Sequence, residues 1–325
     1  MSVAIVIPVY NMATHLENLL RSIWNSGLID TIDELIIFDD GSTDGISEVL
    51  GCFTSPKIKL LRPDKNVGRY LARYEGALSV QSESILFLDA RVEVMSDFVK
   101  GFDKVKHMSI VQGTIDIPAD ESIYSLYWEL SHKRLFNRHY QDKVNGFWLT
   151  NDNYEQYTSG TTIFYVKKDI FINACHSFIT PPACDDRELI RKIVKNHDIW
   201  LTEKLKVNWR PRQNLKNFLG RLLERGPVFV EYHFYDHKTK FRKGVYLGLF
   251  VIFSNLVMML LIPHYFFSLM IFQLFLILLS TVFFAGKTMD FFKLCGLHTL
   301  VVLAFGLGVL WGLVKTHPKC RRYFT

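Results

Sequence analysis

The sequence predicts an α/β domain built on a mostly parallel sheet, followed by a helical transmembrane region near the C-terminus. Two observations carry this prediction. Short apolar and β-branched runs alternate with helix-length segments up to residue 243 of the 325-residue chain, which is typical of βαβ units. From Gly244 to Val314 the charged residues are Lys287, Asp290 and Lys293 alone. Because about 20 apolar residues cross a bilayer as a helix, this stretch excludes a purely soluble protein.

Four strands are expected before residue 90, with helices between them. The strands are Val3–Pro8, Glu34–Phe38, Lys57–Leu61 and Ser84–Leu88, and the helices are Met12–Ser26 and Tyr70–Val80. Alternation at these lengths favours parallel pairing of the strands.

Composition excludes several other classes. The net charge of +6 is modest, and the basic residues cluster around the apolar C-terminal region, so no nucleic-acid partner is expected. Five cysteines without a CxxC spacing argue against a zinc ribbon and against a disulfide framework. The first residues, MSVAIVIPVYN, lack the basic and apolar regions of a secretory signal peptide.

An amphipathic helix is expected over residues 213–225. Its apolar side chains recur with helical spacing at Leu215, Phe218, Leu219, Leu222 and Leu223. Gly226-Pro227 is expected to end it. The helix either packs on the soluble domain or lies in the membrane interface. The predicted organisation is therefore a sheet domain at 1–212, a juxtamembrane segment at 213–243, a transmembrane region at 244–314 and a basic tail at 315–325.

The apolar region divides into three segments, at residues 244–262, 265–285 and 294–314. Pro263-His264 is expected to turn the first two into a hairpin. Basic residues before the first segment place the soluble domain on the cytoplasmic side; they are Lys238, Lys240, Arg242 and Lys243.

The charge of the tail conflicts with three crossings. Its basic residues would be extracytoplasmic if all three segments crossed; they are Lys315, Lys319, Arg321 and Arg322. We expect three crossings, and the alternative is a kinked or re-entrant third segment. Glycines within that segment permit such a path, at Gly296, Gly306, Gly308 and Gly312.

Polar clusters follow the predicted strands. They are PVYN at 8–11, DDGSTD at 39–44, NVGRYLARYEGA at 66–77 and FLDA at 87–90. Ligands of open α/β sheets bind at the carboxyl ends of the strands. Arg69 and Arg73 share a helix face and can reach a diphosphate, although a solvated basic face gives the same pattern. DDGSTD alone is equally consistent with a turn that caps a helix.

In this order the four clusters resemble the start of a family 2 glycosyltransferase of the GT-A fold. SGTT at 159–162 resembles the donor-site turn of that family, and CDDREL at 184–189 resembles its acceptor motif. The segment from VNWRPR at 207–212 to Arg225-Gly226 resembles its closing basic segment. The resemblance covers about residues 1–226 and implies a GT-A fold for the sheet domain.

The resemblance implies a nucleotide-sugar donor at the strand ends. Tyr10 and Asp39 would contact the base, Asp40 the nucleoside region, and Asp89 the diphosphate with its metal ion. The other donor-site residues that it implies are Pro8, Arg69, Arg73, Arg91, Gly160 and Thr161.

The acceptor side would hold the catalytic base. Asp186 would deprotonate the acceptor hydroxyl, and Asp185 would position the acceptor or orient Asp186. Direct displacement by the acceptor inverts the anomeric carbon and requires no enzyme nucleophile.

Two departures from the family pattern matter. The metal motif Asp-x-Asp here reads Asp89-Ala90-Arg91. We expect Mg²⁺ or Mn²⁺ on Asp89, with Glu93 as a candidate substitute ligand; the alternative is that arginines neutralise the diphosphate. The processive motif Gln-x-x-Arg-Trp is also missing, since residues 213–217 read QNLKN. This argues against a polymer-extruding synthase.

Aromatic and basic residues between Ile117 and Thr150 suit either an acceptor site or core packing.

The interpretation is a multi-pass enzyme of the plasma (inner) membrane with its catalytic domain in the cytoplasm. It would move one sugar to a lipid-linked, polyprenyl-diphosphate-type acceptor in exopolysaccharide or O-antigen synthesis. The alternatives are a polyprenyl-phosphate sugar transferase and a catalytically silent membrane scaffold. The sequence leaves the oligomeric state open.

Overall fold

The computed structural model describes residues 2–135, 146–157, 160–176, 185–236, 241–285 and 287–315. The chain forms two compact units. The first comprises Met1–Pro118 and Phe136–Arg210, and the second comprises Ala119–Leu135 and Pro211–Thr325. Residues 119–135 therefore group with the C-terminal helices, although they lie inside the segment 1–212 that the sequence assigns to the sheet domain.

The first unit is built on a nine-stranded mixed sheet of order β3-β2-β1-β4-β8-β6-β9-β5, with β7 paired to β9. The first four strands in chain order pair in parallel, whereas β8 runs antiparallel between β4 and β6. The strands are β1 Val3–Val9, β2 Glu34–Asp39, β3 Ile58–Leu61, β4 Ser84–Leu88, β5 Val92–Val94, β6 Ile110–Asp116, β7 Phe147–Leu149, β8 Ile163–Lys167 and β9 Ile199–Trp209. The mostly parallel GT-A sheet expected from the sequence is confirmed, and β1 to β4 lie within one residue of their predicted bounds.

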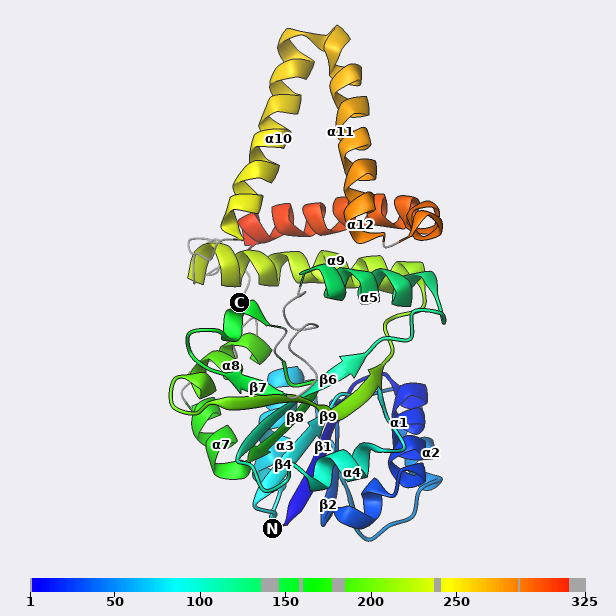
Figure 1. Cartoon of the computed structure of the whole chain (residues 1–325), viewed down its shortest axis with the longest axis vertical. Coiled ribbons are helices and arrows are strands. Elements are labelled where there is room, and N and C mark those ends of the chain that lie inside the picture. Colours follow the sequence, from blue (N-terminus) through cyan, green and yellow to red (C-terminus); the bar gives the residue numbers. More distant parts are fainter. Residues whose placement is uncertain are drawn as a thin grey trace. The chain divides into compact units, whose positions relative to one another are not determined.

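Helices cover both faces of this sheet (Figure 1). They are α1 Ala13–Asn25, α2 Ile46–Gly51, α3 Arg69–Ser79, α4 Phe98–Asp103, α7 Lys168–His176 and α8 Asp185–Val194, with short 3₁₀ turns at Leu28–Thr31 and Tyr154–Gln156. Gly76 sets the height of α3 above the sheet, because a Cβ there would lie 2.8 Å from Cγ1 of Val6 on β1. This close approach places the N-terminal half of α3 beside the strand ends.

The second unit is helical. It holds α5 Ile123–Leu135, α9 Leu215–Val230, the π-helical turn η3 Glu231–Asp236, α10 Arg242–Leu261, α11 Pro263–Phe284 and α12 Thr288–Lys315. The last three helices are each long and apolar enough to span a membrane. The turn of the predicted hairpin falls at Ile262, one residue earlier than expected. Pro263 is the first residue of α11, a position that suits proline because no backbone N–H is needed there.

The prediction that Gly226-Pro227 ends the amphipathic helix is wrong. The helix α9 continues through Pro227 to Val230. Proline lacks an N–H and frees the carbonyl of the residue four positions earlier, here Leu223. The backbone of Gly308 on α12 packs against that carbonyl, since a Cβ on Gly308 would lie 2.5 Å from the Leu223 oxygen. The backbone of α12 therefore packs on α9 at the position where Pro227 removes a hydrogen bond within that helix.

Candidate active site

The carboxyl ends of β1 and β2 are tied together by side chains of the two polar clusters. Asn11 has a φ of 50°, a left-handed conformation that asparagine tolerates. Its N–H donates to Oγ of Ser42 at 2.9 Å, and its Oδ1 accepts from the N–H of Thr43 at 2.8 Å. The sequence singled out neither Asn11 nor Ser42 as functional, yet both fix the edge that a ligand would meet.

Asp39 is fully buried at this edge and offers one carboxylate oxygen. Its Oδ1 accepts from the N–H of Ser42 at 2.9 Å. Its Oδ2 lies 3.1 Å from a guanidinium nitrogen of Arg62 but accepts no hydrogen bond within the described part of the chain. Tyr10 follows β1, next to the Val9–Asp39 pair of the sheet, and is 47% exposed. Buried polar atoms are normally hydrogen-bonded, so this oxygen is a candidate acceptor for a ligand N–H.

Asp40, the expected nucleoside contact, is hydrogen-bonded to the turn before α3. Its two carboxylate oxygens accept from the backbone N–H groups of Val67 at 2.6 Å and Gly68 at 2.9 Å. The side-chain amide of Asn66 donates to its carbonyl at 3.0 Å. Asp40 thus anchors the turn from which α3 begins, and it acts on the site by positioning Arg69 and the rest of that helix.

A cluster of two arginines and two carboxylates, here called the Arg73 cluster, joins α3 to the far side of the site. It consists of Arg69, Arg73, Asp89 and Asp186. The guanidinium of Arg73 lies 2.7 Å from Oδ1 of Asp89 and 3.3 Å from Oδ1 of Asp186. Arg69 lies 3.8 Å from Oδ2 of Asp186. The Arg73 side chain is 4% exposed, so α3 presents a buried cation between two partly exposed carboxylates.

The turn before β8 also reaches this cluster. Oγ1 of Thr161 donates to Oδ1 of Asp186 at 2.5 Å, and Oγ1 of Thr162 donates to Oδ2 of Asp89 at 3.2 Å. A Cβ on Gly160 would lie 4.0 Å from Cβ of Asp186. The expected donor turn and the expected acceptor motif therefore meet. Asp185 begins α8, but its side chain, with Ser159 and Cys184, lies outside the described residues.

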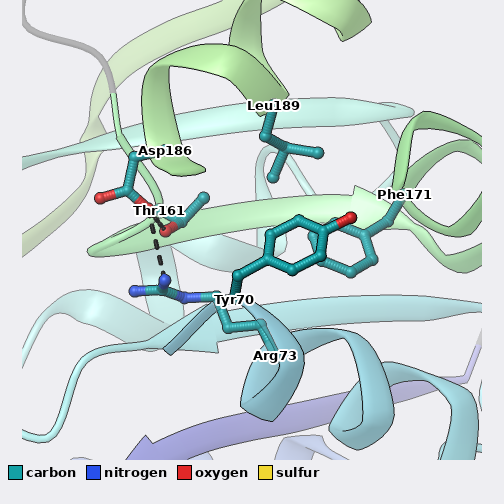
Figure 2. Close-up of a pocket in the computed structure, with 6 residues that line it drawn as sticks. All are labelled: Tyr70, Arg73, Thr161, Phe171, Asp186 and Leu189. Atoms are coloured by element: carbon teal, nitrogen blue, oxygen red, sulfur yellow. Dashed lines mark hydrogen bonds and ion pairs between the residues drawn. The ribbon is translucent and has the colours of Figure 1, made fainter. Parts of the chain in front are cut away.

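An apolar wall stands beside the Arg73 cluster. Figure 2 shows a hollow into which Arg73, Thr161 and Asp186 point from one side, with Tyr70, Phe171 and Leu189 on the other. The hydroxyl of Tyr70 donates to the carbonyl of Cys175 at 3.0 Å, which fixes the ring. Low-polarity surroundings strengthen the ion pairs they enclose. The sequence missed this wall, because apolar residues on helices carry no signal that separates a site from a core.

The buried thiol of Cys175 lies near this wall. Burial raises the pKa of Cys175 to about 12, so the thiol is neutral at physiological pH. Since the thiolate is the reactive form, the site depends on its carboxylates and arginines.

Arg91 and Glu93 contact residues at the end of β9 and just beyond it. The guanidinium of Arg91 stacks on the ring of Trp209 at 5.2 Å. Glu93 accepts from two nitrogens of Arg210, at 2.5 and 3.1 Å. In this structure Glu93 on β5 is paired with Arg210, so its role as a substitute metal ligand stays a prediction.

The residues present fit a metal ion that takes few protein ligands. No group of three His, Cys, Asp or Glu side chains gathers within the described ranges. Asp89 supplies one carboxylate, which now faces Arg73 and Thr162. Mg²⁺ commonly binds through one or two carboxylates plus substrate phosphates and waters, and Asp89 suits that arrangement.

Comparison with known proteins decides the family of the sheet domain. Residues 4–158 match the family described as Glycosyl transferase family 2. This match supports a family 2 glycosyltransferase, as the sequence motifs predict. The match spans Tyr10, Asp39, the two arginines of α3 and Asp89, whereas Asp186 lies beyond it. The family match thus covers β1 to β4 and α3 and ends before Gly160 and Asp186.

Individual relatives agree. The chain is 29% identical over 89 residues to Glycosyltransferase AglE of Haloferax volcanii, a stretch that is 27% of this chain and 29% of AglE. Two solved structures share the fold. The mannosyltransferase PcManGT from Pyrobaculum calidifontis, in complex with GDP-Man and Mn²⁺, has a TM-score of 0.56 and 14% identity, covering 95% of this chain and 87% of its own. TarS 1-349 of S. aureus, in complex with UDP-GlcNAc, has a TM-score of 0.50 and 13% identity, covering 95% and 89%.

Proposed function

We propose that the chain transfers one sugar from a nucleotide-sugar to a hydroxyl of a lipid-linked acceptor, with inversion at the anomeric carbon. One observation carries the proposal: Arg73 lies between Asp89 on the donor side and Asp186 on the acceptor side, at the carboxyl ends of the central strands. The donors bound by the two structural relatives, GDP-Man and UDP-GlcNAc, are both nucleoside-diphosphate sugars. Their chemistry suits a site with a cationic centre.

The donor half of the site would bind the nucleotide in three parts. Tyr10 supplies an exposed ring for the base, and Oδ2 of Asp39 supplies a buried acceptor for a base N–H. Arg69 and Arg73 face the diphosphate, whose paired oxygens match the planar guanidinium. Asp40 contributes indirectly, because it holds the turn from which both arginines project.

The acceptor half would supply the base. Asp186 takes the proton of the acceptor hydroxyl as its oxygen bonds to the anomeric carbon. The bond from that carbon to the diphosphate oxygen breaks, and the nucleoside diphosphate leaves with the electron pair. Arg73 is already within 3.3 Å of the base and 2.7 Å of Asp89, so it is placed to face the negative charge that develops on the leaving group.

A divalent cation completes this proposal. Asp89 would hold Mg²⁺ or Mn²⁺, which supplies positive charge to the leaving diphosphate when bound. The complex of PcManGT contains Mn²⁺. The alternative assigns that charge to Arg69 and Arg73 alone. Arg91 is a weaker candidate, since its guanidinium stacks on Trp209.

The proposed acceptor and location follow from the apolar helices. The α10–α11 hairpin is long enough to cross a bilayer, and α10 starts with Arg242 and Lys243. Basic residues at this end favour the cytoplasmic side of the plasma membrane for the sheet domain. A membrane-held enzyme gains rate on an acceptor confined to the same surface, which favours a polyprenyl-diphosphate-linked sugar in cell-surface polysaccharide synthesis.

The product distinguishes this proposal from its rivals. The full chain is incubated with radiolabelled donor and membrane lipid extract, and the organic phase is analysed. A labelled glycolipid whose new linkage has the anomeric configuration opposite to that of the donor supports the proposal. Label attached directly to a polyprenyl phosphate would favour the polyprenyl-phosphate transferase. Absence of transfer from every nucleotide-sugar would favour a catalytically silent scaffold.

A further inference from the structure

The two ends of α12 lie at the foot of the same apolar hairpin. In its first half, His298 lies 2.8 Å from the hydroxyl of Ser280, which is four residues from the end of α11. Near its other end, the carbonyl of Leu313 accepts from the hydroxyl of Tyr235, in the turn that precedes α10. The helix therefore runs from the foot of α11 to the foot of α10. Figure 1 shows α12 across the hairpin rather than along it.

Ring contacts support the same path. Phe305 of α12 packs on Phe229 of α9 with ring centroids 5.3 Å apart. Phe229 also lies 6.4 Å from Phe241, the residue immediately before α10. Phe305 is past the midpoint of α12, where a spanning helix would be deep in the bilayer. Instead, Phe305 contacts Phe229, which in turn lies beside the first residues of α10.

One face of α12 is packed on the amphipathic helix α9 and on α5. Gly308 and Gly312 lie against the backbone of α9, where added Cβ atoms would come within 2.7 Å of Leu223 and Pro227. His298 also lies 3.0 Å from the hydroxyl of Tyr127 on α5. The rest of this buried face is Leu294, Leu297, Val301 and Ala304.

Those partner helices carry charges that cannot follow α12 into a bilayer. On α9 the pair Arg221–Glu224 lies 3.0 Å apart, and Arg225 stacks on Trp128. A charged residue at the bilayer centre costs about 2.5–3.5 kcal/mol on insertion scales. Because α12 contacts α9 and α5 over most of its length, a crossing would take several such charges with it.

The opposite face of α12 is apolar and exposed. Its large side chains are Phe292, Leu303, Leu307, Trp311 and Val314, each more than half exposed. The charged residues of the helix are confined to its ends, at Asp290, Lys293 and Lys315. An exposed apolar face continuous with a membrane hairpin is typical of a surface that lipid covers.

We propose that α12 lies in the membrane interface, with this apolar face in lipid, and that only the α10–α11 hairpin crosses. The tail after Lys315 then returns to the side from which Arg242 and Lys243 start α10. The basic residues on both sides of the apolar region come to face the same compartment, as the charge rule requires. The chain would then cross the membrane twice, instead of the three times expected from the sequence. The inference is independent of sugar transfer.

A test of which side each terminus faces needs no substitution within the chain. Protease tags are placed before Met1 or after Thr325, and cleavage is measured in sealed vesicles of both orientations. We expect the two tags to be cut from the same side. Cleavage of the C-terminal tag from the opposite side would overturn the proposal.

A depth measurement tests the path of the helix itself. Single spin-labelled cysteines replace Phe292, Leu303 or Trp311 in a variant without native cysteines, and Phe250 and Leu260 on α10 serve as matched controls. Phe292 and Trp311 are about 28 Å apart along a helix. We expect their depths to agree within about one helical turn, or 5 Å, whereas the α10 labels differ by about 15 Å. A depth difference near 28 Å on α12 would refute the interfacial placement. If the cysteine-free variant does not fold, the tag test decides.

Discussion

Replacing Asp186 with asparagine removes the proposed base while keeping the size of the side chain. The structure limits the damage to stability. The Asp186 side chain is 25% exposed. In the variant, the buried guanidinium of Arg73 would still lie 2.7 Å from the carboxylate of Asp89, so its positive charge would keep a negative partner. Partly exposed ion pairs contribute about 0.2–1 kcal/mol, and we expect Asp186→Asn to destabilise the fold by no more than about 1 kcal/mol.

The expected effect on catalysis is much larger. A general base contributes about 10²- to 10⁴-fold to the rate, which corresponds to about 2.7–5.5 kcal/mol of activation free energy. Turnover is measured as release of nucleoside diphosphate at saturating acceptor, and donor affinity by calorimetry. We expect turnover to fall by that factor and donor affinity to change less than threefold, because Asp186 faces the acceptor.

The matched control is Asp103→Asn, which removes a carboxylate from an exposed 2.8 Å pair with Lys106 away from the site. Surface changes of this kind alter stability by about 0.5 kcal/mol or less, and we expect wild-type turnover. Wild-type turnover in Asp186→Asn would refute the assignment of the base. A fall shared equally by both variants would show that the effect is not specific to the site.

Three further predictions address the donor site and the sheet. Asp39→Asn alters the buried acceptor without changing its volume, and we expect donor affinity to fall about 10- to 100-fold, the value of a buried hydrogen bond to a charged group; unchanged affinity in calorimetry would remove Asp39 from the base site. EDTA is expected to abolish turnover and Mn²⁺ or Mg²⁺ to restore it, whereas full activity in the chelated enzyme would move the leaving-group role to Arg69 and Arg73. Burial raises the pKa of Glu34, but hydrogen bonds from Lys59, Ser82 and Gln81 outweigh it and hold the pKa at about 2, below the ordinary 4.5. The lowered pKa stabilises the fold above pH 4.5 by about 3 kcal/mol, a contribution that is lost as the pH falls from about 4.5 to about 2. Denaturant unfolding of wild type and Glu34→Gln should therefore differ at pH 7 and converge near pH 2, and a constant difference across this range would contradict the assignment.

Local patterns in the sequence account for the first half of the sheet. Strands β1 to β4 are short apolar runs separated by helices; β2 pairs in parallel with both β1 and β3, and β4 returns to pair in parallel with β1. The later strands were not predicted. In particular, β8 enters antiparallel between β4 and β6, and this pairing joins distant segments whose local pattern does not specify a partner.

The sequence predicted which residues gather at the site, and their roles stay predictions. Arg69, Arg73, Asp89, Thr161 and Asp186 do come together, as motif order indicates. Asp39 and Asp40 are neighbours at the end of one strand. Oδ2 of Asp39 accepts no hydrogen bond among the described residues, whereas both carboxylate oxygens of Asp40 accept from the backbone of Val67 and Gly68. Sequence cannot separate them, because the difference depends on which way each side chain leaves the strand.

The C-terminal helices show how packing overrides a local signal. Pro227 is a strong helix-ending signal, and Gly308 and Gly312 suggest a kinked segment. In the structure α9 and α12 are both continuous at these positions, and the small residues allow the two backbones to touch. The expected helix end at Gly226-Pro227 was wrong, because α9 continues through Pro227 while its backbone packs against the glycines of α12.

The central claim is that this family 2 domain transfers a sugar from a nucleotide-sugar. The most direct test is release of nucleoside diphosphate by the purified full chain, with a panel of nucleotide-sugars and membrane lipid extract. We predict that at least one donor gives acceptor-dependent release, and that Asp186→Asn abolishes it while Asp103→Asn does not. The absence of acceptor-dependent release with every donor, with and without Mg²⁺ or Mn²⁺, would contradict the account.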